Sequence, residues 1–246
     1  MRWSTFAAPP RFYALAGALL PWLCAAAAVL GAVGLYIGFF VAPTDAQQGE
    51  VYRIIFIHVP AAWMSMLIYV VMAGWAAVGW MLNARMADML ARALAPTGAM
   101  FTALALATGA FWGQPTWGTW WVWDARLTSE LILLLLYLGY IALTEAHDDP
   151  RRGDRAGAIL AIVGVVNVPI VYFSVRWWNT LHQGATISFD AAPKMAATML
   201  AAMLLMTAAF WAYAIAVALA RARAIVLERE ARAGWVRDAL SKEGRA

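Results

Sequence analysis

Residues 128–146 read TSELILLLLYLGYIALTEA, and between Glu130 and Glu145 this stretch carries no charge. A helix needs about 20 predominantly apolar residues to cross roughly 30 Å of hydrocarbon, so the stretch is long and apolar enough to span a membrane. The chain as a whole is 64% hydrophobic and 13% charged, whereas roughly a quarter of an average soluble domain is charged. We therefore predict an integral membrane protein.

Five further stretches of the same kind lie on either side of this one. The six predicted spans are 16–41, 59–82, 94–113, 128–146, 156–175 and 195–219. No linker or internal repeat divides the chain. The predicted fold class is therefore an all-α membrane domain over residues 1–246, built as a six-transmembrane-helix bundle.

The basic residues predict the orientation of this bundle. With six spans, both termini lie on one side, together with the connections 83–93 and 147–155. Of the 18 Lys and Arg residues, only four fall on the other side: Arg53, Arg126, Arg176 and Lys194. Positive charge near span ends stays cytoplasmic, so both termini are expected there. The basic tail 221–246 is expected to lie near anionic lipid or a protein partner; nothing else in the chain favours nucleic acid.

The segment 112–130, WGQPTWGTWWVWDARLTSE, concentrates indole rings on the opposite, outer face. Its tryptophans are Trp112, Trp117, Trp120, Trp121 and Trp123. On a helix, Trp117, Trp120, Trp121 and Asp124 share one face. We therefore expect an amphipathic surface helix that offers a flat aromatic platform, and Gly113 and Gly118 would let a flat ligand approach the backbone.

Two of the three histidines, His58 and His182, fall in outer segments, whereas His147 lies in a charged cytoplasmic turn. Neutral imidazole is a strong ligand for haem iron, and two imidazoles would complete its coordination. Zinc is the competing metal, but it usually takes four ligands. The additional carboxylates available to it would be Asp45, Glu50, Asp124 and Asp190. The surplus of flat indole surface favours a flat apolar ligand over a bare ion.

The charged residues of the outer face have candidate roles toward such a ligand. Arginine forks suit the two haem propionates, and the candidates are Arg53, Arg126 and Arg176. Asp124 is a candidate to orient one of these arginines or a ligating histidine. Glu130 is expected to help begin the fourth span, which Thr128 or Ser129 would cap.

The motif WGTWWVWDARLTSE resembles the tryptophan-rich WWD signature of the haem-handling proteins of cytochrome c biogenesis. IIFIHVPAAWMS and WWNTLHQGATI resemble the histidine-bearing segments of the CcmC family, the six-span group of the bacterial system I pathway, and the resemblance covers most of the chain. The resemblance implies that His58 and His182 are axial ligands of a non-covalent haem b. It also implies a haem-presenting surface that includes Trp117, Gly118, Trp121, Trp123 and Asp124.

The resemblance also implies partners and a location. CcmC-like proteins hold haem at the periplasmic face of the bacterial inner membrane and promote its covalent attachment to the haem chaperone CcmE. They act with CcmD and with the ATP-binding cassette pair CcmA and CcmB. This chain has no GxxxxGK[ST] phosphate loop, so ATP hydrolysis is expected from a partner. Two alternatives stay open: a haem transmembrane transporter subunit, or a structural anchor subunit of an ABC-type complex.

Overall fold

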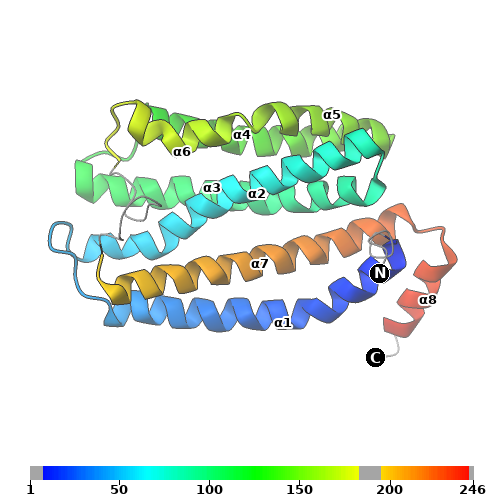
Figure 1. Ribbon diagram of the computed structural model, residues 1–246, viewed down its shortest axis with the longest axis horizontal. Coiled ribbons are helices and arrows are strands. Elements are labelled where there is room, and N and C mark those ends of the chain that lie inside the picture. The colour runs from blue at the N-terminus through cyan, green and yellow to red at the C-terminus, as the bar shows by residue number, and fades with distance from the viewer. Residues whose placement is uncertain (1–7, 183–194, 244–246) are drawn as a thin grey trace.

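The computed structural model describes residues 8–182 and 195–243, and the named elements within these ranges are all helical (Figure 1). The short elements are a π-helical turn, Ile37–Val41, which prolongs α1, and a 3-10 turn, Glu50–Ile54, which precedes α2. The α-helices are α1 (Pro9–Tyr36), α2 (Ile55–Leu82), α3 (Arg85–Trp117), α4 (Ala125–Glu145), α5 (Pro150–Gly164), α6 (Asn167–Trp177), α7 (Ala197–Arg229) and α8 (Gly234–Glu243).

Six helical stretches in the described part of the chain are long and apolar enough to cross a membrane, which confirms the predicted six-span bundle. They are Pro9–Val41, Glu50–Leu82, Arg85–Trp117, Ala125–Glu145, Pro150–Trp177 and Ala197–Arg229. Most of them extend beyond the predicted apolar stretches. The extension arises because backbone hydrogen bonding continues through polar end turns that a hydropathy pattern leaves out.

The helices pack as three layers, with α2 and α3 in the middle, α1 and α7 on one side, and α4, α5 and α6 on the other (Figure 1). The core between the middle layer and α4 contains the fully buried rings of Tyr69 on α2, Phe101 on α3 and Tyr137 on α4. Helix α1 packs mainly on α7 and is largely exposed, so most of its apolar surface is available to lipid.

The fifth predicted span is broken into α5 and α6. Pro169 has no N–H to donate to the carbonyl of Val165, four residues earlier, and a proline ring also clashes with that carbonyl. The chain turns at 165–166, and the Val168 N–H donates to the Val165 carbonyl instead (3.1 Å). The Asn167 side-chain amide donates to the backbone carbonyl of Ser129 (2.9 Å). This bond ties the start of α6 to α4.

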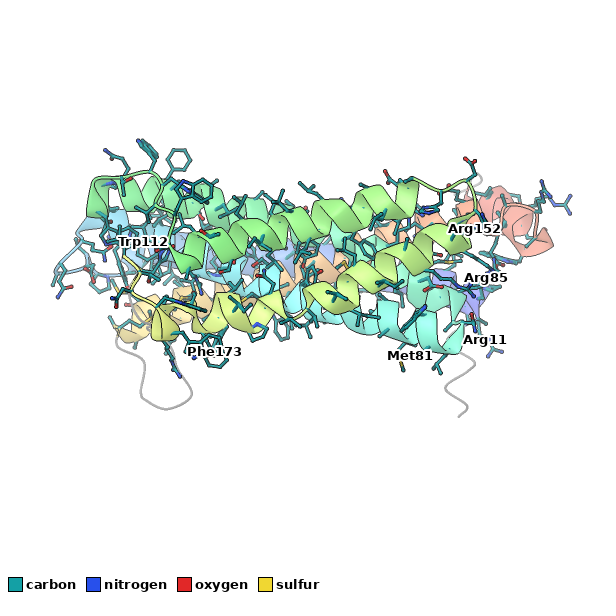
Figure 2. The ribbon with its side chains drawn as sticks, turned by 90° about the horizontal axis from the view of Figure 1, so that it is seen from above. Arg11, Met81, Arg85, Trp112, Arg152 and Phe173 are labelled. Atoms are coloured by element: carbon teal, nitrogen blue, oxygen red, sulfur yellow. The ribbon has the colours of Figure 1, made fainter. Side chains whose placement is uncertain are left out.

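The two ends of the bundle differ in composition. Arg11, Arg85 and Arg152 lie at one end, whereas Trp112 and Phe173 lie at the other (Figure 2). Helix α8 is at the arginine-bearing end (Figure 1). These arginines of the predicted cytoplasmic side therefore share one end of the bundle, away from the tryptophan-rich segment.

Candidate functional site

The tryptophan-rich segment is a helix end, a loop and a helix start. Helix α3 ends at Trp117, and Gly118 follows with a φ of 75° in the left-handed region, which glycine adopts without steric cost. Asp124 caps α4 by accepting a hydrogen bond from the Leu127 N–H (2.8 Å). The predicted amphipathic helix through Trp117, Trp120, Trp121 and Asp124 is therefore wrong, because Gly118 terminates one helix and Asp124 begins the next.

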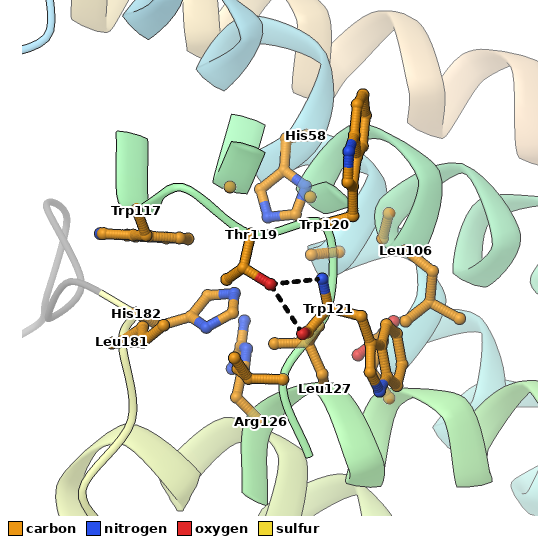
Figure 3. Close-up of a pocket in the computed structure, with 16 residues that line it drawn as sticks. His58, Leu106, Trp117, Thr119, Trp120, Trp121, Arg126, Leu127, Leu181 and His182 are labelled. Atoms are coloured by element: carbon orange, nitrogen blue, oxygen red, sulfur yellow. Dashed lines mark hydrogen bonds between the residues drawn. The ribbon is translucent and has the colours of Figure 1, made fainter. Parts of the chain in front are cut away.

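The loop between α3 and α4 lines a pocket with Thr119, Trp120, Trp121 and Val122 (Figure 3). Both outer-face histidines line it, together with three tryptophans and two charged residues; these are His58, His182, Trp117, Trp120, Trp121, Arg126 and Glu130. The cavity volume is about 30 Å³, whereas small-molecule pockets usually measure about 300–1,000 Å³. A ligand the size of a cofactor would therefore require the lining side chains to move apart.

His58 reaches the pocket from the first turn of α2. Its Nδ1 atom lies 3.0 Å from the Thr108 hydroxyl on α3. The ring of Trp112 stands edge-on to the imidazole, with centroids 5.5 Å apart and an interplanar angle of 81°. Both contacts come from α3, so the orientation of this imidazole depends on the packing of α2 against α3.

His182 follows α6 and enters the same pocket beside Trp117, with ring centroids 5.4 Å apart. Its Nδ1 lies 3.7 Å from Oδ2 of Asp124, and both atoms are buried without a hydrogen-bond partner. Burial lowers the pKa of His182 from 6.5 to about 4; the positive charge of Arg126 acts in the same direction, and Asp124 opposes it. The imidazole is therefore neutral at pH 7, which is the form that binds metals.

The other predicted platform residues lie at different depths. Trp117 and Trp121 are half-buried lining residues, whereas Trp120 lines the pocket but is 55% exposed. Trp123 is 77% exposed and forms a T-shaped pair with the ring of Trp121, with ring centroids 5.3 Å apart. Gly118 is the helix terminator described above. Only part of the predicted platform therefore lines the pocket, namely Trp117, Trp120 and Trp121.

Of the three candidate propionate arginines, the pocket includes Arg126. Its guanidinium also donates to the Val171 carbonyl (2.8 Å), which ties α4 to α6. Arg53 pairs with Glu50 and donates to the carbonyls of Gly38 (2.7 Å) and Ala42 (3.0 Å), so it holds the end of the first span. Arg176 is exposed in the last turn of α6, outside the lining.

Glu130 has a different position from the one expected. The expected cap at Thr128 or Ser129 is wrong, because α4 already begins at Ala125 and Asp124 is its N-cap. Glu130 is buried in the pocket wall, with one carboxyl oxygen 2.8 Å from the Ser65 hydroxyl and the other without a partner. A carboxyl group in an apolar span is a recognised sign of a functional site. That signal was present in the sequence.

The donor set matches haem better than zinc. In the described ranges, no three His, Cys, Asp or Glu residues are grouped to hold a metal ion, and Asp190 lies outside those ranges. Two imidazoles, flat aromatic walls and one partly buried guanidinium would suit an iron, a porphyrin plane and a propionate, respectively. The buried Nε1 atom of Trp121, a lining residue, has no hydrogen-bond partner and would be a donor available to a bound ligand.

Comparisons with known proteins show the family of the chain. The family described as CcmC, heme exporter protein C, matches residues 2–237. Heme exporter protein C of Escherichia coli K12 is 48% identical over 99% of both chains, and that of Bradyrhizobium diazoefficiens is 49% identical over 92% of this chain and 85% of the relative. A putative cytochrome c biosynthesis ccmC-like mitochondrial protein of Marchantia polymorpha is 48% identical over 65% of this chain and 67% of its own. The chain with this histidine- and tryptophan-lined pocket belongs to the CcmC family.

Proposed function

We propose that this protein binds haem b at the periplasmic face of the bacterial inner membrane and presents it for covalent attachment to the chaperone CcmE during cytochrome c maturation. The main supporting observation is that His58 and His182, which are far apart in the chain, line one pocket with Trp117, Trp120 and Trp121. The names of the relatives, heme exporter protein C and cytochrome c biosynthesis protein, support haem as the cargo.

The residues would contribute mainly by positioning. His58 and His182 would hold the iron, the indoles would support the porphyrin plane, and Arg126 would pair with a propionate. Asp124, close to His182 Nδ1, would orient that imidazole. A bound haem would supply the vinyl group for attachment to the chaperone, so this chain would need to position the haem rather than provide a nucleophile.

Arg53 and Arg176 remain candidates for contacts at the edge of the site. Arg53 would first have to exchange its bonds to Glu50 and two backbone carbonyls. The proposed partners are CcmE, CcmD and the ATP-binding cassette pair CcmA and CcmB. Both termini would be cytoplasmic, with the basic tail 221–246 near lipid or a partner.

The proposal is tested by oxidised and reduced optical spectra of the detergent-purified protein with His58→Ala, His182→Ala and, as the control, His147→Ala. Wild type and the control are expected to show low-spin bis-histidine haem, because His147 bonds the Leu143 carbonyl in the turn after α4. Each site variant should lose haem or become high-spin, and should form less CcmE adduct. Normal spectra and adduct levels in either site variant would remove the ligand assignment; no haem in wild type would favour the structural anchor alternative.

A further inference from the structure

We infer that Thr108, on α3, selects the tautomer of His58 and directs the Nε2 lone pair of that imidazole into the pocket. The inference rests on the proposed function, in which His58 is an axial ligand. Thr108 does not itself line the pocket. It is therefore a positioning residue, which acts through its hydrogen bond to His58.

A count of protons around the Thr108 hydroxyl supports the tautomer. Its Oγ1 lies 2.6 Å from the Leu104 carbonyl oxygen, 3.2 Å from that of Ala105 and 3.0 Å from His58 Nδ1. A hydroxyl donates one proton and accepts through its lone pairs, and carbonyl oxygens only accept. The closest carbonyl takes the hydroxyl proton, so the contact with His58 requires Nδ1 to donate. Nε2 then carries the lone pair.

Two neighbours on α3 fix the plane of the same ring. A Cβ atom added to Gly109 would lie 3.1 Å from His58 Cε1, so the glycine leaves space for the imidazole. Trp112 contacts the ring edge-on. Thr108, Gly109 and Trp112 thus form a seat on one side of α3, and the hydroxyl is the member that distinguishes Nδ1 from Nε2.

The two histidines are therefore unequal. His58 is held by a hydrogen bond to a hydroxyl whose proton is already donated to a carbonyl, whereas the 3.7 Å separation of His182 Nδ1 from Asp124 is too long for a hydrogen bond. His58 is the preformed half of the ligand pair. Loss of the Thr108 hydroxyl should consequently disturb the ligand that the fold holds in place.

The experiment compares Thr108→Val, Thr108→Ser and Thr102→Val in the full-length protein, each reconstituted with ferric haem in detergent. Valine keeps the shape of threonine but cannot accept from Nδ1, whereas serine can. Thr102 is the matched control, because it is buried on the same helix and makes the same type of bond, to the Gly98 carbonyl (2.8 Å). Readouts are haem occupancy and the spin state by optical and electron paramagnetic resonance spectra.

We expect Thr108→Val to reduce haem affinity by about 10- to 100-fold, the usual cost of removing a partner of a metal-ligating histidine, and to show a high-spin fraction. Thr108→Ser and Thr102→Val should match wild type. The inference is overturned if Thr108→Val also matches wild type, if serine fails to rescue, or if Thr102→Val has the same defect. Failure of His58→Ala to change the spectrum would instead remove the proposed function.

Discussion

His182 differs from an ordinary surface histidine because its imidazole is largely buried between Trp117 and Asp124. Its pKa is lowered from 6.5 to about 4, chiefly by burial. The unfolded chain therefore binds a proton at this residue at higher pH than the folded protein. The resulting loss of folding stability begins as pH falls through 6.5, grows down to about pH 4, and does not increase below it.

We accordingly expect the His182 imidazole of the haem-free protein to stay neutral from pH 7 down to about pH 4 in a ¹⁵N NMR titration. Asp124→Asn removes the negative charge that favours the protonated ring, so it should lower the pKa further. Titration of the wild-type ring near pH 6.5, or a higher pKa in Asp124→Asn, would contradict the burial of this side chain.

At the scale of helices, the close packing of α3 against α4 depends on a glycine, Gly98. A Cβ atom added to Gly98 would lie 2.1 Å from Cζ of Tyr137. That ring has little freedom to move, since its hydroxyl donates to the Ser65 carbonyl (2.7 Å) and it packs in a T-shaped pair with Tyr69, with ring centroids 4.9 Å apart. Ser65 in turn bonds Glu130 in the pocket wall. Hydrogen bonds through Ser65 therefore connect the α3–α4 contact at Tyr137 to Glu130 in the pocket wall.

Gly98→Ala is expected to destabilise the bundle by about 1–3 kcal/mol, the usual cost of overpacking a core. The control is Gly74→Ala on α2, where an added Cβ meets nothing within 4 Å and alanine should gain about 0.5–1 kcal/mol from helix propensity. The measurement is thermal unfolding in detergent. A Gly98→Ala midpoint equal to that of wild type would show that α3 and α4 can separate at little cost.

Across the whole molecule, the distribution of arginine predicts which end faces the cytoplasm. Arg11, Arg85 and Arg152 lie at the end opposite the tryptophan-lined pocket (Figure 2). The positive-inside tendency then predicts that the pocket faces the periplasm. The single cysteine, Cys24, can be replaced by serine to give a background for site-specific labelling.

In that background, Gln47→Cys beside the pocket end and Asp148→Cys in the turn after α4 occupy exposed positions. A membrane-impermeant maleimide applied to intact spheroplasts should label Gln47→Cys directly and Asp148→Cys only after lysis. The reverse pattern would put the pocket in the cytoplasm and exclude presentation to a periplasmic chaperone. Equal labelling of a lysed sample confirms that both cysteines are reactive.

The sequence by itself predicted the six spans, the separation of charge between the two ends, and the resemblance to the CcmC family. These are local properties, because hydropathy, charge and motif are read along short stretches of chain. The placement of His58 and His182 on one face followed from the number of spans between them. Their roles as ligands stay a prediction that the spectra described above test.

The tertiary structure decided how the site is built. Gly118 and Asp124 replaced the expected surface helix by a loop, Arg53 proved to be engaged at the end of the first span, and Glu130 proved to face Ser65. The role proposed for Thr108 rests on its contact with His58, which only the structure shows. These features depend on contacts between helices far apart in the chain, and hydropathy shows that helices pack without showing which side chains meet.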